Sequence, residues 1–324
     1  DRAFIEDTAT VIYDMDVEVF NALAKAEGAG ETAGLYRCAG AYSDYLAEKA
    51  RARTKYVELH AAQQAEARKV RRHRQAAGKI SRGGVRLASA QGKAKKFFAD
   101  RAAATATRRI RNDDQRLDTL AAREVRKPRN YELSFEFAQP AKRAGVAVSA
   151  RQASVEQRLA PISFDVVYGE HLLVTGANGS GKSTLLNWIS SGQPPADASA
   201  SGTITRDKAV SLVPQHLPRV RDFGFTTDVW RGGIGKAGKG ILHPAMWATP
   251  ILELSAGNQR RAQIAIALAS APTILIIDEP TNYLDLDSMQ VLEDALSEWK
   301  GTLIIASHDR WLIDHWRGSL LTTR

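Results

Sequence analysis

The sequence contains one cysteine, Cys38, among its 324 residues. A single thiol cannot form a disulfide within the chain, which fits a reducing compartment such as the cytoplasm, and we expect Cys38 to be chemically inert. One cysteine also argues against a zinc site built from several thiolates. Any chemistry of this chain must therefore come from other residue types.

Long apolar runs are missing as well. The longest, residues 274–277 and 303–306, have the length of a strand, whereas a membrane helix needs about 18 apolar residues. We expect no transmembrane helix and no signal peptide. With 44% hydrophobic and 25% charged residues, the composition suits one good-sized globular domain with additional elements.

Acidic residues are scarce in one segment. Residues 49–127 contain 23 Lys and Arg against 7 Asp and Glu, whereas the rest of the chain contains 22 against 29. The segment therefore has a net charge of +16 and the remainder −7. Because most globular surfaces mix their charges, this asymmetry predicts a polyanionic partner for residues 49–127.

The basic segment also has the pattern of a helical hairpin. Residues 42–77 are helix formers without Pro or Gly, and a second helical run covers about 95–127, ending at Pro128. Glycines separate the two runs, so they predict an antiparallel hairpin with arms of about 45 Å for 30 residues. A solvated coiled coil is the alternative. The excess of positive charge on both helices favours contact with a nucleic-acid backbone.

The remainder of the chain alternates strands with helices, which predicts an α/β fold with a mainly parallel sheet. A helix is expected at about 258–269. The expected strands are residues 11–16, 131–137, 146–148, 162–166, 172–174, 210–213, 273–277 and 302–306.

A glycine-rich loop lies between the strand at 172–174 and a helix-like segment at 185–189. Backbone N–H groups of such a loop, together with the helix N-terminus, can surround a triphosphate. Lys182 would reach the β- and γ-phosphates, and Ser183 would offer its hydroxyl to Mg²⁺. A chance glycine turn is the alternative. The candidate residues are Gly176, Ala177, Asn178, Gly179, Ser180, Gly181, Lys182, Ser183 and Thr184.

Two acidic residues, Asp278 and Glu279, follow the apolar strand at 273–277. Asp278 would hold Mg²⁺ through water, and Glu279 would polarise the water that attacks the γ-phosphate. Taken alone, the two acids could also be a helix cap. A second helix N-terminus for phosphate oxygens is offered by Ser255, Ala256, Gly257 and Asn258.

Together with Gln215, Asp285 and His308, these motifs resemble the nucleotide-binding cassette of ABC ATPases, in the order of that family. Residues 278–285 and 307–310 are similar to the ABC-F family, cytosolic proteins with two fused cassettes and a charged helical linker. The resemblance implies an ATPase that uses ATP and Mg²⁺. By this resemblance, Glu279 and His308 would be the catalytic residues. Mg²⁺ would be bound by Ser183, Gln215 and Asp278. ATP would be contacted by the glycine loop, Gln215, Asp278, Asp285 and residues 255–258.

The resemblance also implies how the chain is organised and what it binds. Residues 1–40 would be the end of a first cassette, 41–128 a basic hairpin linker and 129–324 a second ABC P-loop cassette. The partners would be the first cassette of the same full-length chain and the ribosome, whose rRNA and tRNA the linker at 49–127 would contact. No membrane domain is expected, the location would be cytoplasmic, and the fragment would be weakly active unless it forms a homodimer through ATP.

The role within the family depends on the linker tip, residues 78–96. The long linker that ends in this tip is similar to the antibiotic-resistance members, which displace ribosome-bound drugs. A housekeeping translation factor is the alternative, and a transporter ATPase or a DNA-repair ABC ATPase fits the basic hairpin less well. Three departures stand out: Asn258 replaces the usual Gln, no aromatic residue occurs around 149–153 to stack on adenine, and the short spacing from Gln215 to Leu254 predicts a small helical subdomain.

Overall fold

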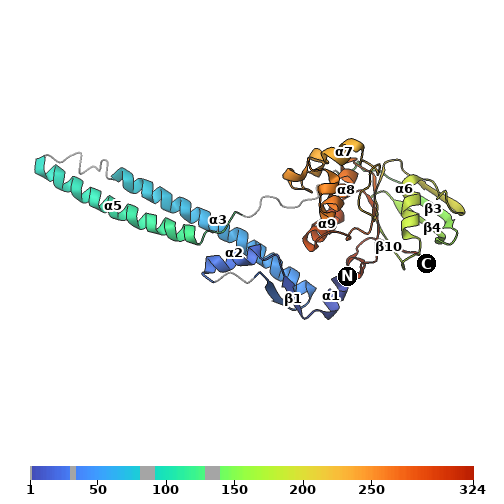
Figure 1. Cartoon of the computed structure of the whole chain (residues 1–324), viewed down its shortest axis with the longest axis horizontal. Coiled ribbons are helices and arrows are strands. Elements are labelled where there is room, and N and C mark those ends of the chain that lie inside the picture. The colour runs from blue at the N-terminus through green and yellow to red at the C-terminus, as the bar shows by residue number, and fades with distance from the viewer. Residues whose placement is uncertain (1, 30–33, 81–91, 128–138) are drawn as a thin grey trace. The chain divides into compact units, whose positions relative to one another are not determined.

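The computed structural model describes residues 2–29, 34–80, 92–127 and 139–324 (Figure 1). The chain divides into two compact units, residues 4–130 and residues 131–324 together with the first three residues. The strand expected at 131–137 and residues 81–91 of the expected tip lie outside the described residues.

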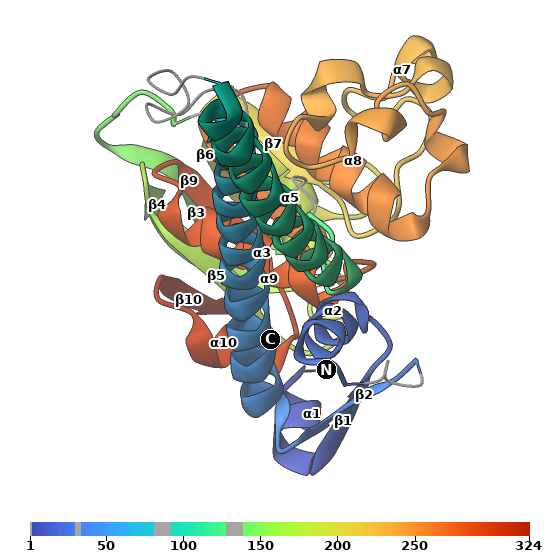
Figure 2. The same cartoon turned by 90° about the vertical axis from the view of Figure 1, so that its left-hand side faces the viewer.

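The first unit is dominated by two long helices, α3 (Tyr42–Ile80) and α5 (Gly92–Ala122), which lie side by side in Figures 1 and 2. His73 Nδ1 lies 2.7 Å from Asp113 Oδ2, and Arg116 Nη2 lies 2.7 Å from Glu66 Oε1. The residue numbers of the paired positions decrease along α5 as they increase along α3, so the two helices are antiparallel. The predicted hairpin is confirmed, although Gly78 lies within α3 instead of breaking it.

Helix α5 ends at Ala122, so the expected helix end at Lys127 is wrong. The reason is Val125, which is 2% exposed and packs with Tyr56, Phe20 and Leu23. Gln63 Oε1 accepts a hydrogen bond from the Val125 backbone N–H at 3.0 Å. Leaving the helix early therefore buries an apolar side chain and gives its backbone a partner from α3.

Smaller elements complete the N-terminal region: α1 (Arg2–Thr8), β1 (Val11–Asp14), α2 (Glu18–Glu27) and β2 (Tyr36–Ala39). Strands β1 and β2 pair antiparallel. Cys38 on β2 is 2% exposed, and burial together with a hydrogen bond to Glu48 raises the pKa of its thiol to about 11. The thiol therefore stays protonated near neutral pH, in line with the inert cysteine expected from the sequence.

The second unit is built on a five-stranded sheet in the order β10-β5-β9-β8-β7, whose described neighbours are all parallel. Its strands are β5 (His171–Thr175), β7 (Val210–Val213), β8 (Ile274–Asp278), β9 (Thr302–Ala306) and β10 (Ser319–Thr322). Every residue of β8 and β9 is buried, which explains their continuous apolar runs. The expected parallel α/β core is confirmed.

A three-stranded antiparallel sheet accompanies the parallel one, in the order β4-β3-β6. Its strands are β3 (Val146–Val155), β4 (Leu159–Val167) and β6 (Ala200–Arg206). Neither β6 nor β10 was predicted, because nearly all of their residues are exposed or half-buried and they lack the apolar alternation of a half-buried strand.

Helices cover the parallel sheet and fix its two apolar faces. They are α6 (Lys182–Ser191), α7 (Thr227–Gly232), α8 (Ala256–Ala269), α9 (Leu286–Glu298) and α10 (Arg310–His315). Along β8, Leu275 and Ile277 belong to one core cluster, while Ile274 and Ile276 belong to the other. The alternation of side chains along a strand thus supplies both cores.

The expected small helical subdomain is present between Gln215 and α8. It holds only α7 and three short 3₁₀ helices, Gly235–Gly238, Pro244–Met246 and Ile251–Glu253.

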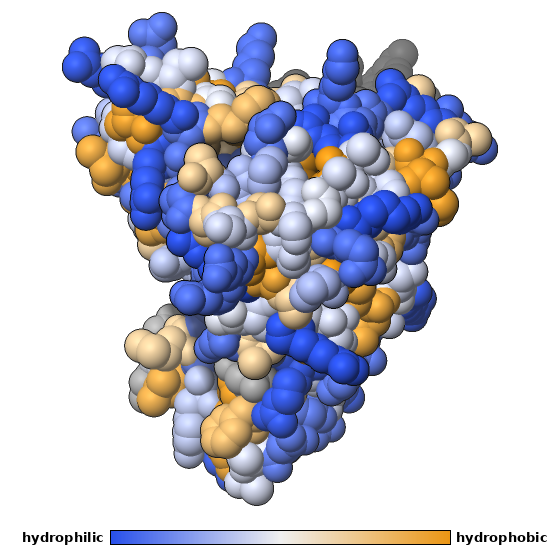
Figure 3. Space-filling view, turned by 90° about the vertical axis from the view of Figure 1, so that its right-hand side faces the viewer, coloured by the Kyte–Doolittle hydropathy of each residue, from blue (hydrophilic) through white to orange (hydrophobic). Residues whose placement is uncertain are grey.

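On the face in Figure 3, hydrophilic residues predominate and apolar residues form small separate groups. No helix in the described part of the chain is both long and apolar enough to cross a membrane.

Candidate active site

The glycine loop leaves the carboxyl end of β5 and enters α6. Gly176, Gly179 and Gly181 have φ of 148°, 85° and 90°, which side chains disfavour. A Cβ at Gly181 would lie 2.2 Å from the Arg158 carbonyl oxygen, whereas a Cβ at Gly179 would meet no atom within 4 Å. The loop is thus packed tightly on one side and open on the other.

Lys182 lies within this loop and is 8% exposed. Its Nζ donates to the carbonyl oxygens of Gly176 at 2.8 Å and Ala177 at 3.1 Å. Ser180 Oγ lies 2.6 Å from Thr323 Oγ1, which ties the loop to the end of the chain. The loop therefore holds its cation at the centre, where an anionic ligand would meet it.

Strand β8 delivers two buried carboxylates to the same edge of the sheet. Asp278 is 5% exposed and Glu279 is 4% exposed. Burial raises the pKa of Asp278, and a hydrogen bond with Ser183 opposes that shift. A serine oxygen beside a carboxylate is a donor set of the kind that Mg²⁺ prefers, so the residues present fit this ion.

Glu279 is bound on both carboxylate oxygens. Its Oε1 lies 2.6 Å from His308 Nδ1, and its Oε2 accepts from Ser307 Oγ at 3.2 Å. Because β8 and β9 are neighbouring parallel strands, residues that follow their ends meet, as the Glu279 N–H does with the Ala306 carbonyl at 2.8 Å. The fold thus joins two residues that lie far apart in the sequence.

A cavity of about 490 Å³ unites most of the predicted residues, a size typical of small-molecule sites. Glycine-loop residues, Gln215, both carboxylates and His308 all line it. Gln157 and Arg158, in the turn between β3 and β4, also line it and were not predicted, because they belong to no motif. The lining residues are Gln157, Arg158, Asn178, Gly179, Gly181, Lys182, Ser183, Thr184, Gln215, Asp278, Glu279 and His308. None is Phe, Tyr or Trp.

Residues 255–258 and Asp285 are described, yet none lines this cavity. Ser255 caps α8 by accepting from the Asn258 N–H at 3.4 Å, and Asn258 Nδ2 lies 3.3 Å from Met246 Sδ. Asp285 caps α9 and accepts from Arg261 Nη2 at 2.6 Å. These residues therefore form a second group on the starts of α8 and α9.

Arg260 on α8 is a residue whose role was not predicted. Its side chain is 0% exposed, and its guanidinium donates to the carbonyl oxygens of Asp278 at 2.8 Å, Glu279 at 2.9 Å and Pro214. Burial lowers its pKa to about 10. Arg260 thus connects the end of β8 to the backbone before Gln215. Sequence spacing gave no sign that this arginine faces inward.

Comparison with known proteins places these features in a family. Residues 159–282 match the ABC transporter family. Similar proteins include the ATP-binding protein Uup of Caulobacter vibrioides, 31% identical over 238 residues, with 66% of this chain and 38% of the relative covered. The ribosome protection protein VmlR of Bacillus subtilis is 34% identical over 170 residues, with 49% of this chain and 30% of VmlR covered.

The energy-dependent translational throttle protein EttA of Escherichia coli K12 is 34% identical over 221 residues, with 61% of this chain and 38% of EttA covered. The chain therefore spans about a third of the length of these curated relatives. The ABC transporter F family member 4 of Arabidopsis thaliana is also similar, 29% identical over 213 residues, with 58% of this chain and 28% of the relative covered. With the glycine loop, the buried acids and the histidine assembled on one parallel sheet, residues 159–282 carry an ATPase domain of the ABC transporter family.

Proposed function

We propose that this chain is the ATPase portion of an ABC-F protein that acts on the ribosome. The observation that carries the proposal is the meeting of Lys182, Glu279 and His308 in one cavity of phosphate-binding character. The substrate would be Mg-ATP. Its phosphates fit the open side of the glycine loop, where Gly179 leaves space.

Each side chain of the cavity would have a definite task. Lys182 would move from the loop carbonyls to the β- and γ-phosphates. Ser183, Asp278 and Gln215 would hold Mg²⁺, which when bound neutralises charge on the phosphates. Glu279 would polarise the attacking water, and its contact with His308 would hold the histidine beside that water and the γ-phosphate.

The remaining predicted residues would act on a second nucleotide. Residues 255–258 begin α8 away from the cavity, so they would present its N-terminus to ATP held by another cassette. Asp285, bound to Arg261, would position that helix start. The other cassette would be the first one of the full-length chain, with residues 1–40 as its end, 41–128 as the linker and 129–324 as the second cassette.

The ribosome is proposed from charge and from the named relatives. Residues 49–127 carry a net charge of +16, and their helices α3 and α5 expose many arginines. VmlR is named a ribosome protection protein and EttA a translational throttle protein. We propose that the hairpin contacts rRNA and tRNA in the cytoplasm, and that the protein protects ribosomes from antibiotics. A translation factor without drug protection is the second candidate, favoured by the likeness to EttA.

The proposal is tested first by nucleotide binding and then by its partner. Equilibrium dialysis should show that the chain binds Mg-ATP, that Lys182→Ala removes binding, and that the exposed control Lys236→Ala retains it. Co-sedimentation should recover the chain with ribosomes, in preference to duplex DNA or membrane vesicles. A chain that binds no nucleotide, or that prefers vesicles or DNA, would contradict the proposal.

Drug protection separates the two candidate roles. In a purified translation system, the full-length protein should restore synthesis in the presence of a ribosome-targeting antibiotic. Substitutions of Val85 and Leu87 in the expected tip should then abolish protection while ribosome binding survives, since they remove no charge. Restoration by no drug tested, together with ribosome binding, would favour the translation factor.

A further inference from the structure

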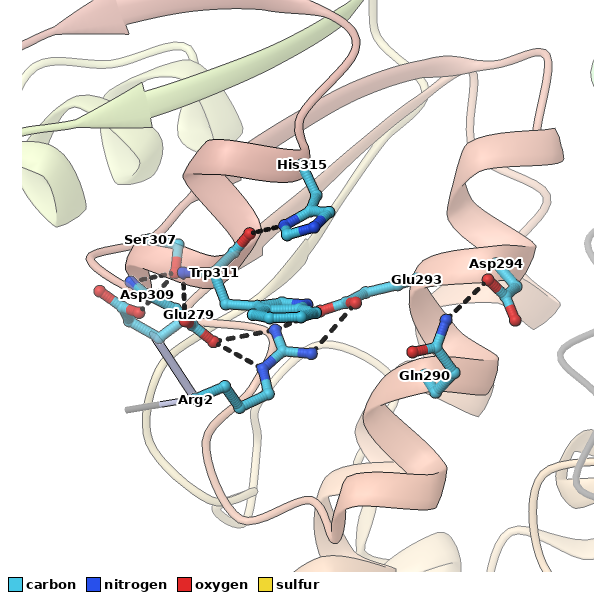
Figure 4. A network of polar contacts seen from close by, with 9 residues as sticks. All are labelled: Arg2, Glu279, Gln290, Glu293, Asp294, Ser307, Asp309, Trp311 and His315. Carbon is cyan, nitrogen blue, oxygen red and sulfur yellow. Dashed lines mark hydrogen bonds and ion pairs between the residues drawn. The ribbon is translucent and has the colours of Figure 1, made fainter. Parts of the chain in front are cut away.

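Arg2 is a charged residue buried outside the nucleotide cavity. It is 3% exposed and lies at the start of α1. Its Nη2 donates to Asp309 Oδ2 at 2.9 Å and its Nε to the same oxygen at 3.2 Å, while Nη1 donates to Glu293 Oε2 at 3.1 Å (Figure 4). Two carboxylates thus share one guanidinium. Burial opposes the charged form of Arg2, but the hydrogen bonds and charges of Glu293 and Asp309 together outweigh it and raise the pKa of Arg2.

Asp309 connects this ion pair to the catalytic carboxylate. The Asp309 backbone N–H donates to Ser307 Oγ at 3.1 Å, and Ser307 Oγ donates to Glu279 Oε2 at 3.2 Å. Figure 4 draws Arg2, Asp309, Ser307 and Glu279 with these hydrogen bonds. Arg2 is therefore linked to Glu279 through the side chain and the backbone of Asp309 and through the hydroxyl of Ser307. His308 lies between the two linking residues in sequence and contacts the other oxygen of Glu279.

The arrangement depends on the positive charge of Arg2. Without it, Asp309 and Glu293 would be two carboxylates, 9% and 19% exposed at their side chains, with no cation between them. Buried or half-buried like charges repel strongly, and an unpaired buried carboxylate is costly. Asp309 would turn toward solvent, and the backbone of 307–309 would move with it.

We propose that Arg2 is a positioning residue for the Glu279–His308 pair. Arg2 anchors the carboxylate of Asp309 and thereby fixes the backbone of residues 307–309. That backbone segment holds Glu279 and His308 in their reactive arrangement. The inference rests on the proposed ATPase function. Neither Arg2 nor Asp309 lines the nucleotide cavity, so Arg2 acts on the chemical step and not on the affinity for Mg-ATP.

Turnover and affinity test this separation. Arg2→Met keeps the apolar length of the side chain and removes the charge. It should lower kcat by between about tenfold and a hundredfold, as misplacement of a reacting group does, with an unchanged Kd for Mg-ATP. Arg2→Lys keeps the positive charge but lacks the planar guanidinium that binds both carboxylates, so it should recover part of kcat. The control Arg317→Met, at an exposed arginine just beyond α10, should change neither quantity.

A double-mutant cycle tests the route. Asp309→Asn removes the anchored charge but keeps an oxygen to accept from the Trp311 N–H. If Arg2 acts through Asp309, the double variant should be no slower than the worse single variant. Fully additive losses in kcat would overturn the route.

Amide hydrogen exchange provides a second measurement, which does not require turnover. In the Mg-ATP complex, Arg2→Met should accelerate exchange at residues 307, 309 and 311 and leave the amides of α6 unchanged. Exchange at 307–311 equal to wild type, or acceleration that includes α6 equally, would overturn the proposal. A full-length protein that binds but never hydrolyses Mg-ATP would instead count against the proposed ATPase, while the exchange comparison would still decide the role of Arg2.

Discussion

At the scale of single residues, Glu279 is constrained both in its backbone and in its side chain. Its φ of 52° lies in the left-handed region, which non-glycine residues rarely occupy, and its carboxylate is bound at both oxygens. Backbone strain of this kind persists only where the surroundings impose it, and here β9 and residues 307–308 do so. The strain and the contacts together aim the carboxylate into the cavity.

Glu279→Gln should keep the binding of Mg-ATP and nearly abolish its hydrolysis, because an amide cannot take a proton from the attacking water. General base catalysis contributes about 10² to 10⁴ in rate, which sets the size of the loss. Phosphate release measured beside nucleotide binding checks this. Glu298→Gln, at an exposed glutamate, is the matched control. Unchanged phosphate release by the Glu279 variant would remove this residue from the mechanism.

Arg260 carries a second prediction at this scale. Arg260→Met leaves the buried carbonyl oxygens of Asp278 and Glu279, and the half-buried one of Pro214, without this donor. Each unsatisfied buried group costs about 1 to 3 kcal/mol, so we expect the free energy of unfolding to fall by about 3 kcal/mol or more. Urea denaturation measures it. Arg231→Met removes an exposed arginine and should change the free energy by less than about 0.5 kcal/mol. Equal stability of the two variants would refute the structural role of Arg260.

At the scale of elements, patterns of burial decided what could be predicted. Strands β8 and β9 and helix α8 were recognisable because whole runs of their residues are buried. Strands β6 and β10 were not, because they lie at the ends of their sheets and present mostly exposed residues. The early end of α5 depends on Val125 meeting Tyr56, a contact between residues far apart in sequence. Local patterns do not contain such information.

The hairpin helices carry a salt-dependence prediction. If 6 to 10 phosphate contacts form, ribosome affinity should fall by about 10³ to 10⁵ between 50 and 200 mM salt. Arg71→Ala and Arg108→Ala each remove an exposed charge and should flatten the salt slope by about one. Arg116 already pairs with Glu66 at 2.7 Å, so Arg116→Ala should flatten it less.

Binding titrations at several salt concentrations measure these slopes. A slope near zero for the unmodified chain would mean that the hairpin makes no phosphate contacts. Equal effects of Arg71→Ala and Arg116→Ala would show that the pairing with Glu66 does not survive in the complex. Both results are independent of whether the protein protects against any drug.

At the scale of the whole molecule, the sequence predicted which motifs exist but not which of them meet. Parallel strands placed Asp278, Glu279 and His308 beside the glycine loop, as expected from an α/β fold. The same fold leaves residues 255–258 outside the cavity, because α8 begins on the side of the small helical subdomain. Gln157 and Arg158 entered the cavity through a turn of the antiparallel sheet, which no motif marks.

Because residues 255–258 lie outside the nucleotide cavity in the part of the chain that the structure describes, hydrolysis should require two copies. Two chains in a symmetric dimer would each offer Ser255 to the ATP in the other's cavity. Turnover per chain should therefore rise with protein concentration. Concentration-independent turnover, at a rate equal to that of the full-length protein, would contradict this.

Mixing two inactive variants gives the sharper test. Lys182→Ala removes the lysine of the nucleotide cavity and leaves residues 255–258 intact. Ser255→Ala alters residues 255–258 and leaves the nucleotide cavity intact. In a mixture, each mixed dimer has one intact cavity facing one intact Ser255. Since random pairing makes half of the dimers mixed, about a quarter of the wild-type turnover should return. Each variant is inactive alone, so turnover by the mixture can arise only if the two halves of the active site come from different chains. If the mixture shows no turnover at concentrations where the wild type is active, both halves lie within one chain.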